Sequence, residues 1–232
     1  MNYEPHGSSY PRDLAQGRQA GVAAFFRYVY AWMALALVVT GMTSGLILSN
    51  RSVLVVAAQY NMMTMLATFG VGMFLSVRAN TLKSSTVAQL FLLYSALMGA
   101  MLAPVLFMYT TASVAKAFFV TGGTFGATAA YGYATKRDLT GVGSFAMIGL
   151  IGGIIASLVN IFLRSAAIDF VVSYALVVVF ASLTAYDNQR LRQMYAQAGG
   201  TANLAIFGAM TMYLNFINLF LNLLRIMGDR RD

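Results

Sequence analysis

The chain has 232 residues, of which 59% are hydrophobic and only 9% are charged, and its mean hydropathy is +0.70. A soluble domain carries about 25% charged residues, so this composition predicts an integral membrane protein. The net charge of +8 does not indicate nucleic-acid binding, because the basic residues stand at the ends of apolar runs. The lack of cysteine excludes disulfides and thiolate metal sites but leaves the cellular compartment open.

Three parts follow one another along the chain. Residues 1–22 are polar, contain Pro5 and Pro11, and are predicted to form a flexible cytoplasmic tail without a cleavable signal. Residues 23–228 are expected to form an all-α transmembrane domain of seven helices, and 229–232 a short C-terminal tail. No loop is long enough to house a soluble domain, so the function is expected in or at the lipid bilayer.

Seven apolar runs define the expected helices. A helix needs about 20 apolar residues to cross a bilayer, and most of these runs reach that length. The second run is the weakest, because Gln59 and Asn61 interrupt it. The runs lie at 25–49, 53–77, 86–109, 113–134, 142–163, 168–188 and 204–227.

The distribution of lysine and arginine favours a cytoplasmic N-terminus. With seven spans in that orientation, nine basic residues lie inside and six outside. The C-terminus then lies outside; if the last run were re-entrant, its three arginines would join the inner side. The inner set is Arg12, Arg18, Arg27, Arg78, Lys83, Lys136, Arg137, Arg190 and Arg192, and the outer set is Arg51, Lys116, Arg164, Arg225, Arg230 and Arg231.

The last run carries a polar stripe along one helical face. Its members follow at steps of three or four: Gly208, Thr211, Asn215, Asn218, Asn222 and Arg225. Polar groups at membrane depth cost free energy unless they face protein or water, so this helix is expected to be buried among others.

Small residues at a spacing of four occur on two other runs. Gly122 and Gly126 form one pair, and Gly149 and Gly153 form another. This spacing lets helix backbones approach closely, and we expect packing to be its role. A hinge or a pore constriction is the alternative.

Residues that could carry enzyme chemistry are scarce. The single histidine, His6, lies in the N-terminal tail, and no nucleophile–base pair or phosphate-binding glycine loop occurs. The chain is therefore expected not to be an enzyme and to need no cofactor. Of its seven acidic residues, only Asp187 lies near the end of a long apolar run.

Asp187 has a candidate partner in Arg78, which ends the second run on the same side of the membrane. Opposite charges there would form a latch that protonation of Asp187, or a bound cation, weakens. Burial raises the pKa of a carboxylate and a neighbouring arginine lowers it, so the sequence alone does not give the direction of the net shift. The alternative is that Asp187 is simply hydrated at the inner interface.

Three segments resemble the transmembrane Bax inhibitor motif family, particularly its bacterial branch. They are YGYATKRDLTGVGSF at 131–145, LTAYDNQRLR at 183–192 and MYLNFINLFLNLLRIMG at 212–228. With the spacing between them, the likeness covers nearly all of residues 20–230.

The resemblance implies a fold in which the last helix is central and two groups of three helices wrap it. It also implies a pH-sensitive calcium leak in a bacterial inner membrane, with calcium ions and protons as partners. The sensor in such members is a pair of aspartates on the last two helices, and an arginine on the second helix pairs with the first aspartate. Asp187 matches that aspartate, and Arg78 matches the arginine.

The second aspartate is missing, because MYLNFINLF places Asn215 where the family reads aspartate. Two close carboxylates titrate as a coupled pair, whereas Asn215 can only donate a hydrogen bond to ionised Asp187. Calcium prefers six to eight oxygen ligands, so a site on Asp187 would be weak. The candidate ion pathway adds four polar side chains: Asn218, Asn222, Asn188 and Thr211.

Two functions are therefore expected in competition. The first is a cation leak, with calcium as the transported ion, gated at Asp187 and Arg78. The second, also implied by the resemblance, is a non-conducting protein that binds another membrane protein, such as a membrane protease, and modulates stress survival. The loss of the second aspartate keeps the second function open.

Overall fold

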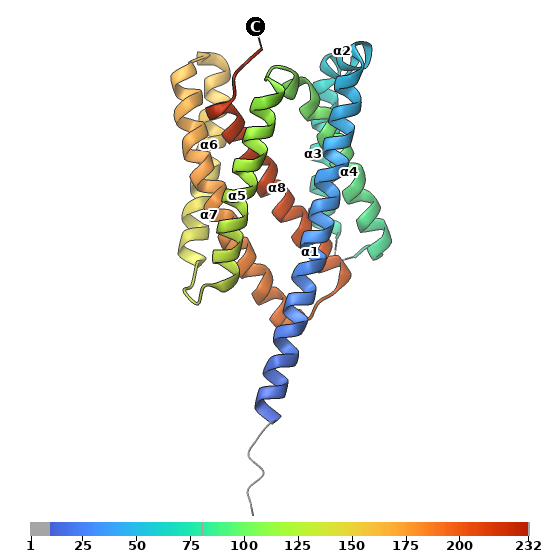
Figure 1. The fold of residues 1–232 in the computed structure, drawn as a ribbon, viewed down its shortest axis with the longest axis vertical. Coiled ribbons are helices and arrows are strands. Elements are labelled where there is room, and N and C mark those ends of the chain that lie inside the picture. Colours follow the sequence, from blue (N-terminus) through green and yellow to red (C-terminus); the bar gives the residue numbers. More distant parts are fainter. Residues whose placement is uncertain (1–9, 80, 232) are drawn as a thin grey trace, which may run out of the picture.

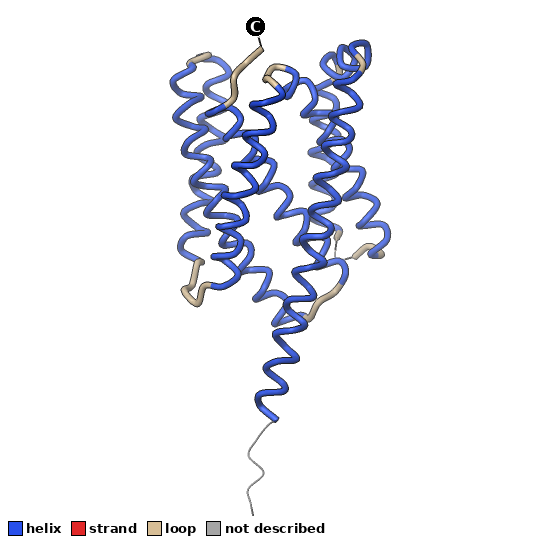
Figure 2. Tube along the Cα trace, viewed as in Figure 1, coloured by secondary structure: helices blue, strands red, loops and turns tan. Residues whose placement is uncertain are grey.

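The computed structural model of the chain describes residues 10–79 and 81–231, which form eight helices joined by short turns (Figures 1 and 2). Within these residues the only β-type pairing is an isolated bridge between Tyr109 and Arg230, so the all-α prediction is confirmed. The helices are α1 (Tyr10–Ser49), α2 (Arg51–Gln59), α3 (Asn61–Arg78), α4 (Ser84–Phe107), α5 (Thr111–Ala134), α6 (Thr140–Leu163), α7 (Ala166–Ala198) and α8 (Ala202–Met227).

Five helices are long and apolar enough to cross a membrane: the part of α1 at Ala20–Ser49, and α4, α6, α7 and α8. The bent pair of α2 and α3 would make a sixth. Helix α5 has 24 residues but is not among them, since threonines, glycines and Lys116 lower its hydropathy. A helical membrane protein is thus confirmed, whereas the count of seven spans is not.

The sequence predicted one helix for the second apolar run, 53–77, but the structure has two helices there. Helices α2 and α3 meet at an angle of 68° around Tyr60, whose backbone (φ −97°, ψ 14°) is not helical. Asn61 donates from Nδ2 to the carbonyl oxygen of Met101 on α4 at 3.0 Å. The polar residues that weakened this run in the sequence therefore flank the bend.

Helix α1 spans Tyr10–Ser49, so residues 10–22 are helical and continue into the first apolar run. Pro11 lies in the first turn, where its missing N–H has no intrahelical partner to lose. Residues 1–9, the rest of the predicted N-terminal tail, lie outside the described residues. The described N-terminal end of α1 and the C-terminal end of the chain lie at opposite ends of the bundle (Figure 1).

Helix α8 is the centre of the bundle. In its most apolar stretch 72% of the residues are buried, against 11% for α6. It contacts α1 and α4 on one side and α5 and α7 on the other, while α2 and α3 complete the first group and α6 the second. The expected arrangement, a central last helix wrapped by two groups, is confirmed.

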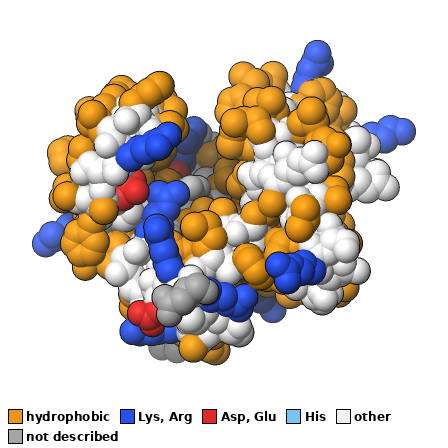
Figure 3. Space-filling model, turned by 90° about the horizontal axis from the view of Figure 1, so that it is seen from above, with side chains coloured by type: hydrophobic (Ala, Val, Ile, Leu, Met, Phe, Trp, Pro, Cys, Tyr) orange, Lys and Arg blue, Asp and Glu red, His pale blue; other side chains and the backbone are white. Residues whose placement is uncertain are grey.

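Glycine marks the closest helix contacts, but not at every predicted position. A Cβ on Gly149 or Gly153 would meet Val179 at 2.8 Å or Leu176 at 2.5 Å, so this pair packs α6 on α7 as expected. Nothing lies within 4 Å of a Cβ on Gly122 or Gly126, so the packing prediction is wrong for that pair. Many large apolar side chains on the outside of the bundle are exposed, as contact with lipid requires. In the end-on view of Figure 3, apolar side chains gather around the rim of the bundle.

The C-terminal residues fasten α8 to the turn between α4 and α5. The amide of Thr110 donates to the carbonyl of Asp229 at 3.0 Å, and the amide of Arg231 donates to the carbonyl of Met108 at 2.9 Å. The amide of Asp229 also donates to the hydroxyl of Ser113 at 2.9 Å. We call residues 229–231, held in this way, the C-terminal clasp.

Candidate functional site

Asp187 lies on α7 where this helix crosses α8. Its Oδ2 accepts a hydrogen bond from Nδ2 of Asn215 at 2.7 Å. Asp187 is partly buried, whereas Asp138, Asp169 and Asp229 are exposed, so it is the most enclosed of these four acidic side chains. The hydrogen bond that the sequence suggested between Asn215 and Asp187 is present.

The contact between α7 and α8 depends on small and amide side chains around this pair. A Cβ on Gly208 would lie 2.9 Å from the side chain of Leu191, so glycine allows α7 to approach at this level. Asn188 is fully buried and donates from Nδ2 to the carbonyl of Thr184 at 2.9 Å. Its Oδ1 accepts from the hydroxyl of Tyr30 at 2.5 Å, so α1 is joined to the same region.

Arg78 is not part of this cluster. It ends α3 as an exposed residue, and α3 packs chiefly on α4. Within the described residues, the Asp187 carboxylate accepts a side-chain hydrogen bond from Asn215, and the nearest basic residue along α7 is Arg190. The latch between Arg78 and Asp187 is therefore not formed in this structure.

Arg190 is the charged neighbour that the sequence reasoning missed. It follows Asp187 by three residues on the same helix, a spacing at which helical side chains are neighbours. The signal for this neighbour is the motif DNQR, in which Arg190 follows Asp187 by about one helical turn.

The members of the polar stripe of α8 are buried to different degrees. Asn215 and Asn222 are buried, with 5% and 4% of their surface exposed, whereas Thr211 and Asn218 are only partly buried. Asn218 and Asn222 donate to carbonyl oxygens one turn earlier, at 2.8 Å each, and Thr211 does so at 3.1 Å. Oδ1 of Asn222 is buried without a hydrogen-bond partner, so the stripe keeps an unused acceptor near the core.

The described residues contain no group of three His, Cys, Asp or Glu side chains that could hold a metal ion. At Asp187 the oxygen ligands at hand are its carboxylate and the amide oxygen of Asn215, because the amide oxygen of Asn188 accepts from Tyr30. Calcium takes six to eight oxygens, so these residues could provide only transient, partly hydrated contact with the ion.

Comparison with known proteins identifies the group to which this architecture belongs. The family model described as "Inhibitor of apoptosis-promoting Bax1" matches residues 22–232. This chain belongs to the Bax inhibitor-1 family. The resemblance that three segments indicated is thus confirmed over almost the whole chain.

Bacterial relatives in the Bax inhibitor-1 family are similar over nearly their full length. The inner membrane protein YbhL of Escherichia coli is 41% identical over 221 residues, covering 92% of this chain and 94% of that protein. The protein RP147 of Rickettsia prowazekii is 40% identical over 91% of this chain and 92% of its own length. A relative in Borreliella burgdorferi is 37% identical over 95% of this chain and 99% of its own length.

Two turns of this Bax inhibitor-1 family member are held by side chains whose role the sequence did not reveal. Gln189 of α7 donates to the carbonyl of Arg137 at 2.7 Å and accepts from the amide of Leu139 at 2.9 Å. Asn203 of α8 donates to the carbonyls of Ala79 and Leu82, both at 2.9 Å. The α5–α6 and α3–α4 turns are thereby fixed to the two helices that form the site.

Proposed function

We propose that this protein is a cation leak of the membrane, with calcium as the transported ion and the Asp187–Asn215 contact as its gate. The observation that carries the proposal is the 2.7 Å hydrogen bond between these two side chains. It joins α7 to the central helix α8 at an acidic residue more enclosed than Asp138, Asp169 and Asp229. A carboxylate among apolar helices costs free energy, and such residues generally mark ion or proton pathways.

The gate would respond to any species that competes for the carboxylate. A proton on Asp187, or a cation beside it, reduces the strength with which its Oδ2 accepts from Asn215. This weakens a polar contact between α7 and α8, and one helix can then shift against the other. The side-chain amide of Asn215 does not titrate, so the pair would sense pH through a single carboxylate.

Arg78 has a different place in this mechanism from the one expected for a latch. Because it is exposed at the end of α3, pairing with Asp187 requires a second arrangement of the helices. We propose that the structure represents the state in which Asn215 donates its hydrogen bond to the Asp187 carboxylate and Arg78 is not paired with it. Asn218, Asn222 and Thr211 would then line the route along α8.

A reconstituted flux assay tests the gate. Calcium entry into proteoliposomes containing a calcium dye is compared for the natural chain, Asp187→Asn and Arg78→Ala between pH 5 and 8. We expect Asp187→Asn to change the flux about tenfold, the effect of about 1.4 kcal/mol, and to remove its pH dependence. Asp169→Asn is the matched control, since Asp169 is an exposed acid near the other end of α7. Equal flux and pH dependence in Asp187→Asn and the natural chain would refute the gate.

Asn215→Asp tests the altered sensor separately. Two carboxylates in this contact would share a proton, so the variant should acquire a steeper dependence of flux on pH. The slope of log flux against pH measures this. An unchanged slope would mean that position 215 does not take part in sensing.

A non-conducting interaction protein is the second candidate, and one observation favours it. Gly122 and Gly126 are exposed on α5 with nothing within 4 Å of their Cβ positions, so this small-residue face is not used inside the bundle. Such a face lets another transmembrane helix approach closely. A partner that co-purifies stoichiometrically and is lost in Gly122→Ile, together with no flux from the protein alone, would favour this candidate over the leak.

We further propose that the protein lies in the bacterial inner membrane with its N-terminus in the cytoplasm. The distribution of lysine and arginine supports the orientation, and the similarity to the inner membrane protein YbhL of E. coli supports the choice of membrane. The cysteine-free chain permits a direct test with single cysteines at Lys136 and Arg164, in turns at opposite ends of the bundle. An impermeant thiol reagent added to intact spheroplasts should label Arg164→Cys and spare Lys136→Cys.

A further inference from the structure

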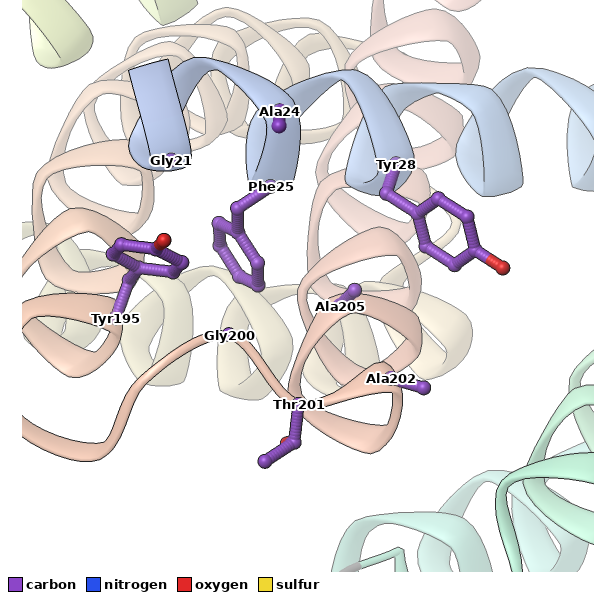
Figure 4. A pocket seen from close by; sticks show the side chains of 9 residues that line it. All are labelled: Gly21, Ala24, Phe25, Tyr28, Tyr195, Gly200, Thr201, Ala202 and Ala205. Carbon is purple, nitrogen blue, oxygen red and sulfur yellow. The ribbon is translucent and has the colours of Figure 1, made fainter. Parts of the chain in front are cut away.

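A cavity of about 410 Å³ opens at the end of the bundle where α7 turns into α8. Helix α1 forms one wall, with Ala24, Phe25 and Tyr28, and the first turn of α8 forms the opposite wall, with Ala202 and Ala205 (Figure 4). Tyr195, near the end of α7, closes one side. The Asp187–Asn215 pair does not line this cavity, so the cavity is separate from the proposed gate.

The aromatic wall is held in place by close packing. The rings of Phe25 and Tyr195 lie 5.0 Å apart between centroids. Glycines leave room for Tyr195 on two sides: a Cβ on Gly21 would lie 2.5 Å from its hydroxyl oxygen, and a Cβ on Gly200 would lie 2.5 Å from Cε2. Tyr28 is 54% exposed and extends from α1 at the open side of the cavity (Figure 4).

The polar groups around the cavity favour a negative ligand. No acidic side chain lines it; its polar side chains are the hydroxyls of Tyr28, Tyr195 and Thr201. The first turn of α8 faces it. The amide of Leu204 donates to the Thr201 hydroxyl at 3.1 Å, while the earlier amides of this turn have no intrahelical acceptor and carry partial positive charge. Aromatic rings alone would also suit a cation, but this positive helix end and the net charge of +8 oppose one.

The location of the cavity limits what can reach it. The turns at this end of the bundle carry several basic residues, among them Lys83, Lys136 and Arg137, as expected where a membrane protein meets a headgroup layer. Tyrosines are typical of that interface, because their rings are apolar and their hydroxyls remain hydrated. A ligand that presents an anionic head and an apolar chain at this depth is a phospholipid.

We propose that this cavity binds one anionic phospholipid, whose phosphodiester lies at the start of α8 and whose acyl chain lies against Phe25 and Tyr28. The bound lipid would then contact α1, α7 and α8 together, at the end opposite to the C-terminal clasp. This proposal does not depend on ion conduction.

The chain contains its own reporter for the test. Trp32 is its only tryptophan and lies four residues after Tyr28 on α1, about 6 Å along the helix axis. The full-length protein is reconstituted into phosphatidylcholine vesicles that contain increasing fractions of phosphatidylglycerol with brominated acyl chains. Quenching of Trp32 is compared with that by brominated phosphatidylcholine at equal fractions. We expect the anionic lipid to associate about fivefold more strongly at this site.

Variants separate the cavity from the basic surface around it. Ala24→Leu and Ala202→Leu fill the cavity from opposite walls, and each should reduce the preference to near unity. Ala127→Leu, at an exposed position on α5, makes the same change elsewhere and should retain the full preference. Trp32 emission in plain phosphatidylcholine checks that each variant is folded.

Two results would overturn the proposal. One is equal quenching by the two brominated lipids in the natural chain. The other is a preference for the anionic lipid that survives both cavity variants and disappears in 0.5 M salt. Diffuse attraction to basic side chains would behave in this way, because salt screens it and the cavity variants leave those side chains unchanged.

Discussion

Helices α6 and α8 have similar lengths but opposite surroundings. The most apolar stretch of α6 has a mean hydropathy of 2.3 and is 11% buried, whereas that of α8 has a mean hydropathy of 1.7 and is 72% buried. The more apolar helix is thus outside, because lipid is its solvent, and the helix with three asparagines is inside. In this molecule, polar residues at helical spacing indicate the centre better than hydropathy does.

The largest expected difference between the two helices concerns side-chain truncation. Leu219 on α8 is fully buried, and Leu219→Ala should destabilise the protein by about 2–5 kcal/mol through the cavity it leaves. Ile151 on α6 is 54% exposed, so Ile151→Ala should cost less than about 1 kcal/mol. Unfolding in mixed micelles with increasing denaturing detergent measures both. Equal costs would break the contrast between an enclosed and a lipid-facing helix.

Adding a methyl group should also affect an enclosed position more than a lipid-facing one. A Cβ on Gly132 would clash with the backbone of Ala185, so Gly132→Ala should destabilise the contact between α5 and α7 by about 1–3 kcal/mol. Nothing lies within 4 Å of a Cβ on Gly152 of α6, and Gly152→Ala should be neutral or slightly stabilising. Thermal unfolding midpoints in detergent compare the two, and a stable Gly132→Ala variant would contradict the close approach.

Buried hydroxyls sharpen the same comparison at smaller cost. Oγ1 of Thr40 lies 2.6 Å from the hydroxyl of Tyr213 on α8 and 2.9 Å from the carbonyl of Ser95. Thr40→Val should therefore cost about 0.6–1.7 kcal/mol, the range of interhelical hydrogen bonds in membranes. Ser144→Ala removes an exposed hydroxyl from α6 and should change the unfolding midpoint little. If both substitutions were silent, the contact of Thr40 with Tyr213 would contribute nothing to stability.

The weakest expected effect lies in the turn before α6. Hydrogen bonds from the hydroxyl and amide of Thr140 hold the pKa of Asp138 below its usual value. A depressed folded-state pKa stabilises the protein above the unfolded value of about 3.9, and this contribution is lost as the pH falls through the folded pKa. Asp138→Ala should thus lower the unfolding midpoint slightly at pH 6, and by progressively less as the pH falls below about 3.9. A difference independent of pH would assign the effect to the turn itself.

Patterns within single helices predicted much of this structure. The polar stripe of α8 predicted a helix buried among others, because such a stripe depends on helical spacing alone, whereas the contact between Asp187 and Asn215 was implied by the family resemblance. The interruption at Gln59 and Asn61 marked the bend between α2 and α3. The family motifs gave the central position of the last helix.

Features that depend on where helices end relative to one another were not predictable in the same way. Arg78 was paired with Asp187 because both lie near one membrane face, but α3 ends beside α4 and leaves Arg78 exposed. Gly122 and Gly126 have the same spacing as Gly149 and Gly153, and only the arrangement of neighbouring helices decides that the first pair is unpacked. The C-terminal clasp joins the residues after α8 to the turn between α4 and α5, and two of the three hydrogen bonds that define it use backbone groups that any sequence provides.

The central position of α8 has a consequence for biogenesis, because this helix leaves the ribosome after every helix that encloses it. Its neighbours enter the bilayer with their inner faces unmatched, and the side chains of Thr40 and Asp187 lack their partners on α8 until that helix is made. Insertion of α8 therefore joins the group of α1–α4 and the group of α5–α7 into one bundle in a single late step. Quality control that recognises unpaired polar groups within the membrane would act during that interval, and a substitution in α8 would prolong it.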